Sequence, residues 1–497
     1  MNAKTKHFTV IGAGAAGLAA AATLAQKGHR VTVLEKNSTV GGRGRVFQER
    51  GYTFDMGPSW YWMPDVFEGF FSRFGRSSSD FYELVRLDPA FRIIFGPSDI
   101  LDVPGTEDGL LSMLERIEPG SGVRARRFFD EGRLKYEIGV RSLAFKPARS
   151  ITEFIDRKLI TNLHKLHLLK RFDRYVRSFF TDPRLIQLME FPILFLGTLP
   201  STTPAMYSFM NYGGFIGGTW YPKKGMHEIA IALKSVAQAQ GATINTGAEV
   251  QGLVTSNGSK GIVKELLVGD ERIATDGVVA AADYSHVDSK LLPQQHRRYS
   301  ERYWRSRVLA PSSLIIYLGI NRRVPNLLHH NLFFDADFSK HAAQLTTKPT
   351  WPDDPLFYVS CPSKTDSTVA PEGCENLFVL VPIASWLDDS DEQRATIRAK
   401  VLARLEAHTG ISLTGCIEYE RMYCSRDFVA DYHALGGNAY GLANTLLQTA
   451  IGKPEMVSRK LSNLVYAGQL TVPGPGLPPS LISGQVAADM LHKRNGA

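Results

Sequence analysis

A glycine-rich turn near the N-terminus constrains the fold of this chain more than any other feature of its sequence. Gly12, Gly14 and Gly17 follow the apolar segment His7–Ile11 and precede an alanine-rich segment that ends near Gly28. The pattern predicts a buried strand, a tight turn and a helix that stops at the last glycine. Gly12 permits the turn, Gly14 lets the backbone approach a pyrophosphate, and Gly17 allows the helix to pack closely on the strands.

An acidic residue completes this nucleotide-binding unit. Residues 31–34 read as a second strand, which ends at Glu35, about twenty residues after the turn. At that position a carboxylate can accept hydrogen bonds from the ribose hydroxyls of an adenosine. The helix after the turn presents free N–H groups and its positive end to phosphate, so we expect Ala16 to lie beside the phosphates with the glycines. The sequence therefore predicts a dinucleotide-binding βαβ unit.

The residues that follow this unit indicate which dinucleotide is bound. Gly42 and Arg43 stand in a Gly-Gly-Arg motif after the second strand, and Gly57, Pro58 and Ser59 follow a Tyr-Thr-Phe-Asp segment. This combination resembles the amine oxidase and phytoene desaturase superfamily of flavoproteins. The resemblance implies that the cofactor is FAD and that the loop with Gly42 and Arg43 lies along its pyrophosphate and ribityl chain. It also implies that Gly57, Pro58 and Ser59 contact the cofactor.

An uncharged segment near the other end of the chain, residues 461–488, holds the second half of the expected site. Its four prolines and several glycines exclude a membrane-spanning helix. They favour a strand, a glycine turn and a helix whose first turn contains Pro478 or Pro479. The start of that helix can direct its positive end at the flavin. The superfamily resemblance implies an FAD domain assembled from both chain ends, with Gly468, Gln469 and Pro478 at the cofactor.

The same segment is close to one branch of the superfamily. The run GQLTVPGPGLPPSLISG resembles the C-terminal signature of bacterial-type phytoene desaturases, although Gln469 stands where many superfamily members have an acid. Residues 437–443 (GNAYGLA) resemble that family's loop near the flavin ring. The resemblance implies a carotenoid desaturase, which introduces conjugated double bonds into a long polyene by FAD-dependent dehydrogenation. No second glycine turn followed by a ribose acid occurs, so we expect oxygen or a membrane quinone to reoxidise the flavin.

The order of these segments predicts an α/β fold with discontinuous domains. We expect residues 1–89, 223–289 and 416–497 to form a Rossmann-like FAD-binding domain. Residues 290–415 are expected to form the sheet of an interleaved α+β substrate domain, and residues 90–222 a helical lobe that associates with a membrane.

Two stretches of the expected helical lobe bear on its partners. Between residues 157 and 177, seven basic residues accompany one acid and leucines recur at helical spacing, which predicts an amphipathic basic helix. Such a helix can lie on an anionic membrane or can be an ordinary surface helix with a solvated basic face. Residues 191–222 carry no charge and are rich in aromatic residues and methionine. That composition suits an apolar tunnel or a membrane-dipping mouth, and it also suits core packing.

The pair Asp130 and Arg133, and separately Val250, each allow a functional and a structural interpretation. Asp130 and Arg133 lie three positions apart in a predicted helix over residues 123–136 and therefore share a face. They match an acid and an arginine proposed for acid–base work in the family, and the alternative is a surface ion pair. The resemblance also places the backbone of Val250 against the adenine, whereas its side chain alone fits any apolar core.

Charge and composition exclude several classes of protein. The net charge of +8 is a mild excess with no dense Lys/Arg tract, so we expect no nucleic-acid partner. The histidines show no metal-ligand spacing and the four cysteines no CxxC pair, so we expect no metal site and reduced thiols. Residues 8–26 resemble a secretion signal because two lysines precede an uncharged stretch, but the glycine spacing argues for a phosphate-binding turn. We therefore expect a cytoplasmic protein that associates peripherally with a membrane.

Two other functions use the same fold. A flavin amine oxidase shares both FAD-binding ends but usually needs an aromatic cage for an amine. A non-enzymatic prenyl- or lipid-binding escort protein binds lipid tails without flavin chemistry. The intact Gly14, Gly17, Glu35, Gly42 and Arg43 argue against the escort protein. The proline-rich C-terminal segment and the basic helix favour a polyene over an amine.

Overall fold

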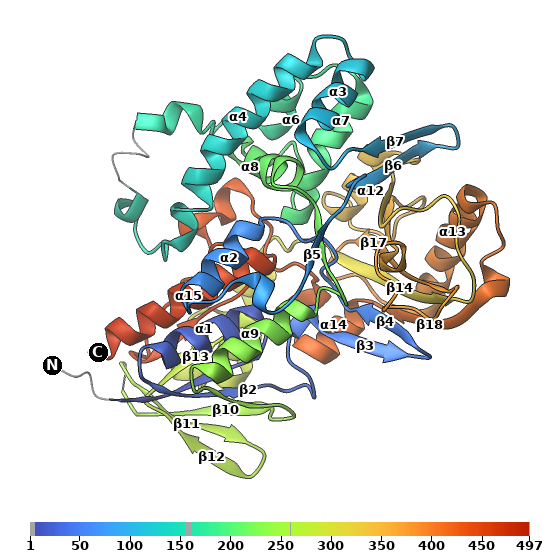
Figure 1. The fold of residues 1–497 in the computed structure, drawn as a ribbon. Helices are drawn as coiled ribbons and strands as arrows, with labels where there is room; N and C mark the ends of the chain where they lie inside the picture. The colour runs from blue at the N-terminus through green and yellow to red at the C-terminus, as the bar shows by residue number, and fades with distance from the viewer. Residues whose placement is uncertain (1–4, 155–160, 259, 497) are drawn as a thin grey trace.

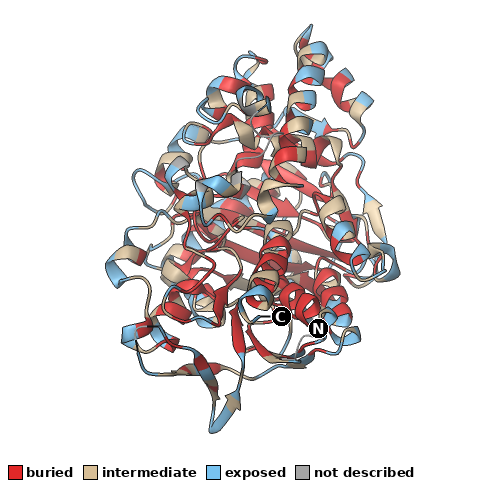
Figure 2. Ribbon diagram, turned by 90° about the vertical axis from the view of Figure 1, so that its left-hand side faces the viewer, coloured by how far each residue is buried: buried red, intermediate tan, exposed pale blue. Residues whose placement is uncertain are grey.

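The computed structural model describes residues 5–154, 161–258 and 260–496, and it contains three regions. Figure 1 shows a sheet with its helices at one end, a second and larger sheet beside it, and a helical lobe next to both. Buried residues fill the interior of the sheet regions and the space between them (Figure 2). The first and last described segments lie together, since Lys6 Nζ donates a hydrogen bond to the Asn495 carbonyl at 2.6 Å.

A parallel sheet joins the first strands of the chain to strands from its middle and its end. Among the described residues it has five strands in the order β19-β13-β1-β2-β9, and every neighbouring pair is parallel. The first two strands occur where the glycine pattern predicted them. The strands are β1 His7–Ile11, β2 Arg30–Leu34, β9 Thr243–Asn245, β13 Gly277–Ala280 and β19 Leu464–Tyr466.

The helix after the glycine turn, α1 Ala15–Gln26, is buried almost completely. It packs on the sheet between α9 Glu228–Ala239 and α15 Leu477–Arg494. A helix that is apolar on all sides is stable where other elements surround it, which explains the run of alanines. A Cβ added to Gly484 would lie 2.0 Å from the Ala16 carbonyl oxygen, so the backbones of α1 and α15 are in direct contact.

A second sheet, with seven strands among the described residues, has the order β18-β14-β17-β16-β15-β6-β7. One face of β14 packs on α13 Asp391–Thr409 through Leu314, Ile316 and Leu318. The opposite face, which carries Ile315 and Tyr317, belongs to the core shared with the helical lobe. The strands are β6 Phe91–Gly96, β7 Asp99–Val103, β14 Ser312–Ile320, β15 His330–Phe333, β16 Phe357–Ser360, β17 Glu375–Ile383 and β18 Ile417–Tyr423.

Three of these strands come from outside residues 290–415, the range expected for this sheet. β6 and β7 belong to the segment assigned to the helical lobe, residues 90–222, and β6 pairs in parallel with β15. β18 belongs to the segment assigned to the FAD-binding domain, residues 416–497, and pairs with β14. A short strand gives little local information about its partner, because strand preference depends on the neighbours that it packs against.

Smaller pairs of strands complete the described structure. An antiparallel sheet of β10 Val250–Thr255, β11 Val263–Val268 and β12 Glu271–Ala274 lies beside the parallel sheet. Two further pairs are β3 Val46–Glu49 with β4 Tyr52–Asp55, and β5 Leu84–Arg86 with β8 Trp220–Pro222.

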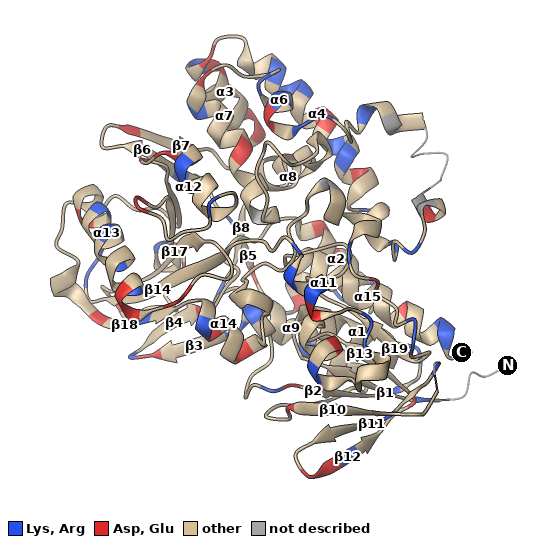
Figure 3. Cartoon of the chain, turned by 180° about the vertical axis from the view of Figure 1, so that it is seen from behind, with Lys and Arg blue, Asp and Glu red and all other residues tan. Residues whose placement is uncertain are grey.

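The helical lobe is a cluster of helices above the two sheets (Figure 1). Lys and Arg are mixed with Asp and Glu over the lobe and over the rest of the face shown in Figure 3. In the part of the chain that the structure describes, no helix is both long and apolar enough to cross a membrane. The helices are α3 Glu107–Ile117, α4 Ser121–Gly139, α6 Phe172–Val176, α7 Pro183–Glu190 and α8 Phe209–Asn211.

The predicted basic helix over residues 157–177 is wrong for its described part. In that part residues 161–162 are helical, Leu163–Lys165 form a 3-10 turn and α6 has five residues, so the helix is not continuous; residues 155–160 lie outside the described residues. Instead of continuing a helix, the backbone binds residues 203–205. The Phe172 N–H donates to the Thr203 carbonyl at 2.9 Å, and the Lys170 carbonyl accepts from the Ala205 N–H at 2.7 Å.

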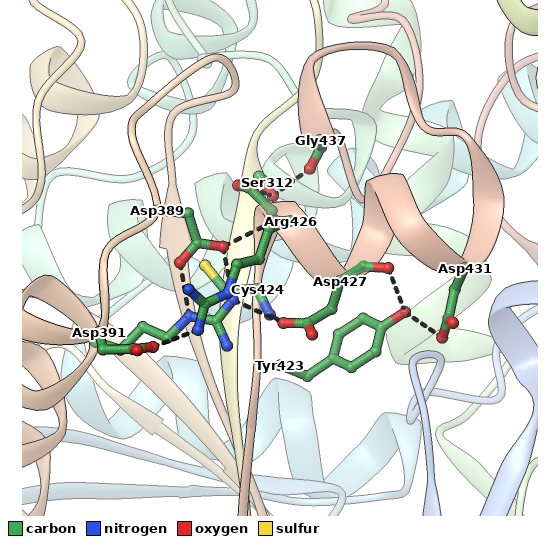
Figure 4. Close-up of polar contacts among 11 residues, drawn as sticks. Ser312, Asp389, Asp391, Tyr423, Cys424, Arg426, Asp427, Asp431 and Gly437 are labelled. Atoms are coloured by element: carbon green, nitrogen blue, oxygen red, sulfur yellow. Dashed lines mark hydrogen bonds and ion pairs between the residues drawn. The ribbon is translucent and has the colours of Figure 1, made fainter.

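An ion-pair network fixes α14 Ser425–Tyr432 between the large sheet and α13. Arg394 of α13 donates to Asp389 at 2.6 and 2.7 Å and to Asp427 at 2.7 Å. Figure 4 shows Asp389 and Asp427 converging at the start of α14. Burial opposes the effect, but the Arg394 hydrogen bonds hold the pKa of Asp389 below its ordinary value. The other end of α14 carries Asp431 toward the cavity described below.

The Arg394→Met variant tests this network. We expect its free energy of unfolding at pH 7 to fall by about 3–5 kcal/mol, because the substitution leaves a buried carboxylate without its partner. The folded pKa of Asp389 is depressed, so its contribution is present above about pH 4 and is lost as the pH falls through the folded pKa. The stability difference between wild type and variant should therefore shrink in acid. Denaturant unfolding followed by circular dichroism, at pH 7 and in acid, measures the free energy of unfolding of wild type and variant.

Arg305→Met is the matched control for that variant. Its partner is Glu301, and the two side chains are 71% and 79% exposed. An exposed pair of this kind contributes about 0–1 kcal/mol. If the free energy of unfolding falls by the same amount in the two variants, the Arg394 network is no more stabilising than a surface ion pair.

Candidate functional site

One cavity of about 860 Å³ extends from the carboxyl ends of the parallel strands to the seven-stranded sheet and the helical lobe. Almost all of the residues that the sequence assigns to a cofactor lie on its wall. Gly17 is the exception, and a Cβ there would lie 1.9 Å from the Gly12 carbonyl oxygen, which agrees with its expected packing role. The wall residues are Gly12, Gly14, Ala16, Glu35, Gly42, Arg43, Gly57, Pro58, Ser59, Val250, Gly468, Gln469 and Pro478.

Two glycine loops meet at the start of α1. The Gly41 N–H donates to the Ala13 carbonyl at 2.8 Å, and a Cβ added to Gly42 would lie 3.2 Å from the Gly14 Cα. Gly12 has a φ of 95°, a conformation that favours glycine. The free N–H groups and the positive end of α1 therefore face a narrow cradle that no side chain fills. A pyrophosphate fits the shape and the charge of this cradle.

Glu35 is buried at the end of β2, where neighbouring donors fix its carboxylate. One oxygen accepts from the Ala13 N–H at 2.7 Å. The other accepts from the Asn37 N–H at 2.9 Å and from the Asn37 side-chain amide at 3.0 Å. An ionised carboxylate has about four acceptor positions, so Glu35 keeps capacity for ribose hydroxyls.

Arg43 brings positive charge to the middle of the cradle. Its Nη2 donates to the Asn438 carbonyl at 3.3 Å, and its Cζ lies 4.9 Å from the ring centre of Tyr432. With its amide oxygen facing the guanidinium, Gln469 accepts hydrogen bonds from Arg43 at 3.0 and 3.3 Å. Burial lowers the pKa of Arg43, and among the described residues its Nε–H has no hydrogen-bond partner. A buried donor without a partner is costly, which fits a site that receives an anionic cofactor.

The start of α15 closes this half of the cavity. Pro478 and Pro479 lie in its first turn, as predicted, where a missing N–H removes no hydrogen bond of the helix. The Gly468 N–H donates to the Ser483 hydroxyl at 3.0 Å, which holds the end of β19 against α15. The positive end of α15 thus faces the same space as the positive end of α1.

The other half of the cavity is lined mainly by apolar side chains from the large sheet and the helical lobe, including residues 191–222. Residues 191–222 contribute to this wall, but Ala205 and Phe215 of the same stretch pack in the core. The stretch therefore both lines the cavity and packs in the core, and Leu196 does both. The apolar wall includes Leu143, Leu166, Leu194, Leu196, Met206, Phe209, Met210, Ile315, Leu332 and Leu380.

Several polar side chains at the nucleotide end were not predicted. Asp283 follows β13 at the carboxyl edge of the sheet and accepts from the Ser285 N–H at 3.0 Å. The rings of His286 and His433 stack 3.8 Å apart, and His433 lies 2.9 Å from Glu249. Burial, followed by His433, lowers the pKa of His286 to about 4 and keeps it neutral. The position of Asp283 after a strand was a usable signal, whereas nothing in the sequence pairs the two histidines.

The structure does not bring Asp130 and Arg133 to the cavity. They share one face of α4 as expected, with Oδ1 and Nη2 3.4 Å apart, but the side chains are 57% and 52% exposed. Neither residue lies on the cavity wall. This geometry agrees with the alternative of a surface ion pair.

Comparisons with known proteins place these features in a family. The model of the family "flavin containing amine oxidoreductase" matches residues 15–492. The chain is 40% identical over 487 residues to a carotenoid 3,4-desaturase of Haloarcula japonica, covering 98% of each. It is 34% identical over 503 residues to a zeta-carotene-forming phytoene desaturase of Myxococcus xanthus, covering 99% of this chain and 95% of that protein.

Solved structures of amine oxidases share the fold. A putrescine oxidase bound to putrescine has a TM-score of 0.60 at 16% identity, covering 98% of this chain and 99% of that one. A cyclohexylamine oxidase from Brevibacterium oxydans has a TM-score of 0.60 at 14% identity, with 99% of both chains covered. The cradle at both chain ends, the family match and the near full-length relatives lead to one conclusion. The chain belongs to the carotenoid desaturases, within the flavin-containing amine oxidoreductase family, and is an FAD-dependent oxidoreductase.

Proposed function

We propose that this enzyme introduces conjugated double bonds into a long carotenoid, as a desaturase of the phytoene desaturase type that acts on CH–CH bonds. The observation that carries the proposal is one cavity that has a polar nucleotide half and an apolar half, joined along the loop with Ser59 and Trp60. A hydrocarbon offers no group for ionic binding, so its affinity comes from burial of apolar surface, about 25 cal/mol per Å². FAD supplies the oxidation, and the apolar half holds the polyene beside it.

The wall residues have separate proposed roles toward FAD. Glu35 would bind the ribose hydroxyls, and the backbone of Val250 would contact the adenine. The start of α1 and Arg43 would bind the pyrophosphate, whose charge the cradle neutralises. Gln469 and the start of α15 would orient the ribityl chain and the pyrimidine edge of the flavin, where reduction adds negative charge.

The positions of acidic groups favour a polyene over an amine. Among the described wall residues, the carboxylates are Glu35, Glu249, Asp283 and Asp431. Each is already bound by protein donors: Glu35 and Asp283 as described above, Glu249 by His433, and Asp431 by Arg45, at 2.5 Å. The apolar half of the described wall contains no carboxylate that would bind a cationic substrate.

We propose that the apolar half is filled from a membrane surface. Leu168 and Leu169 lie on the cavity wall and are 37% and 91% exposed. Leu447 is 87% exposed and Ile451 56%, close in sequence to the wall residue Ala450. Exposed lysines and an arginine flank these leucines: Lys165, Lys170 and Arg171. Apolar side chains next to basic ones suit the surface of an anionic bilayer.

We propose oxygen or a membrane quinone as the electron acceptor. The sequence holds no second dinucleotide-binding unit for a nicotinamide. Peripheral contact with a membrane would give a quinone the same access that the polyene has.

Pigment formation tests the proposed function. We expect the chain, expressed in cells that make phytoene and separately in cells that make lycopene, to convert one of them to a product with a longer conjugated system. Chromatography with absorption spectra identifies the product. Gly42→Val is the negative control, because its side chain would fill the pyrophosphate cradle. If both carotenoids stay unchanged and putrescine releases hydrogen peroxide, the amine oxidase is favoured. If the protein stays colourless after FAD is added, the escort protein is favoured.

Glu35→Gln tests the ribose contact. Hydrogen bonds to a charged group contribute about 1.5–3 kcal/mol, so we expect FAD to bind roughly 10- to 100-fold more weakly. Titration of the apoprotein with FAD, followed by flavin fluorescence, measures the dissociation constant. Glu49→Gln, at an exposed position of β3, serves as the control. Equal dissociation constants for wild type and Glu35→Gln would remove Glu35 from the site.

Leu169→Asp combined with Leu447→Asp tests the membrane contact. We expect at least a tenfold loss of co-sedimentation with phosphatidylglycerol vesicles, since each buried leucine contributes about 1.5–3 kcal/mol. Wild-type binding should also weaken at high salt and with phosphatidylcholine vesicles, because the basic side chains contribute. Ile262→Asp replaces an exposed isoleucine beside β11 and is the control. Unchanged binding of the double variant would show that these leucines do not contact the bilayer.

A further inference from the structure

A row of side chains crosses the large sheet on the face that borders the cavity. Strand register pairs Ile315 with Leu380, Leu380 with Tyr358, and Tyr358 with Leu332. All four lie on the cavity wall. Residues paired across neighbouring strands point to the same face of a sheet, so these side chains form one continuous strip. Tyr358 is the member of the strip with a proton-transferring group.

A histidine lies directly behind this tyrosine. His330 Nδ1 is 2.6 Å from the Tyr358 hydroxyl, and His330 is completely buried. Its ring stacks on Trp60, with ring centres 4.2 Å apart and planes 11° apart. Among the described residues its Nε2 has no hydrogen-bond partner. A buried nitrogen without a partner is costly, and such groups are often found where a protein uses them for function.

The pair lies beside the cofactor half of the cavity. Burial raises the pKa of Tyr358, and the Ser360 and Ser59 hydroxyls oppose that rise. Ser59 follows Gly57 and Pro58, which line the cofactor half, and it precedes Trp60 on the same wall. Tyr358 therefore lies at the junction of the two halves, where a substrate bond next to the flavin would be held.

Among the other proton-transferring groups on the described wall, His341, Tyr207 and Lys146 are already engaged, and burial is the only cause that raises the pKa of Tyr440, with no titratable partner. The His341 Nδ1 accepts from the Leu356 N–H at 3.0 Å, and its Nε2 lies 3.0 Å from the Pro382 carbonyl. The Tyr207 hydroxyl shares a hydrogen bond of 2.8 Å with Thr449. The Lys146 Nζ donates to a backbone carbonyl at 2.6 Å. Only the Tyr358 hydroxyl among these has a titratable partner that can pass a proton into the protein.

We propose that Tyr358 accepts the proton that the polyene loses in each desaturation and that His330 receives Tyr358's own proton. This inference rests on the proposed dehydrogenation. A hydride leaves one carbon for FAD, and the electron pair of the neighbouring C–H bond forms the new double bond. The proton of that bond goes to the Tyr358 oxygen while the hydroxyl proton goes to His330 Nδ1. The products are the new alkene, reduced FAD and an imidazolium, which balances atoms, charge and electrons.

The surroundings of His330 and Tyr358 make this pair a weak base. Burial lowers the pKa of His330, and that of its neighbour His329 to about 3, so both are neutral before the reaction. A C–H bond becomes strongly acidic when a hydride leaves the adjacent carbon, so a strong base is unnecessary. The face of Trp60, which stacks on the ring, would stabilise the imidazolium. Tyr358 is thus the catalytic residue of this step, and His330 is its positioning residue and proton store.

Anaerobic reduction of the bound flavin by a polyene in vesicles tests this assignment. We expect Tyr358→Phe to slow flavin bleaching about 100-fold, the scale of general acid–base catalysis. FAD content should not change, and neither should polyene binding, which quenching of tryptophan fluorescence measures. His330→Gln should slow bleaching in the same way. The wild type should react more slowly in D₂O, because the hydroxyl proton moves, and Tyr358→Phe should lose this isotope effect.

Tyr82→Phe is the matched control. Its hydroxyl shares a buried hydrogen bond of 3.0 Å with Tyr61, and Tyr82 is not on the cavity wall. We expect it to reduce flavin at the wild-type rate. Bleaching by Tyr358→Phe at the wild-type rate, or a loss matched by weaker polyene binding, would overturn the proposal. If no polyene reduces the wild-type flavin, the proposed function itself fails, and this inference fails with it.

Discussion

The parallel pairing of β1 with β13, and of β13 with β19, is the contact on which the rest of the site depends. It aligns strands from the start, the middle and the end of the chain. The loops after these strands therefore meet at one sheet edge, where Gly12, Asp283 and Gly468 line the same cavity. In parallel α/β sheets a ligand binds at this carboxyl edge, because the loops and the helix N-termini converge there. The contact of α15 with α1 holds the arrangement, since Gly484 leaves no space for a side chain.

The two halves of the cavity have linings of different chemistry. Its nucleotide half has two helix N-termini and the Arg43 guanidinium, which compensate the charge of a dinucleotide. Its other half consists mostly of leucine, methionine and aromatic side chains, which gain free energy by covering a hydrocarbon. A buried carboxylate in the apolar half would need a partner or a proton. The described wall has no carboxylate in that half.

The fold by itself does not separate this enzyme from amine oxidases. The two amine oxidases share the fold at 16% and 14% sequence identity, each with a TM-score of 0.60. Fold and function separate because the reaction depends on the side chains that line the site. In this chain those side chains include the strip of Ile315, Leu380, Tyr358 and Leu332, and residues from the stretch 191–222.

The sequence determined the elements whose signals are local. The glycines from Gly12 to Gly17 and the prolines at 478 and 479 each encode a turn or a helix start that needs no distant partner, and Glu35 is recognised by its distance in sequence from the turn. Tertiary structure decided the rest. The basic segment near Lys170 is not a long helix, because its backbone binds the segment near Thr203. The register of β15 with β16 brings His330 to Tyr358, and no periodicity in either strand shows that pairing. A local pattern reports which side of a segment is buried, whereas the partner that buries it depends on the whole chain.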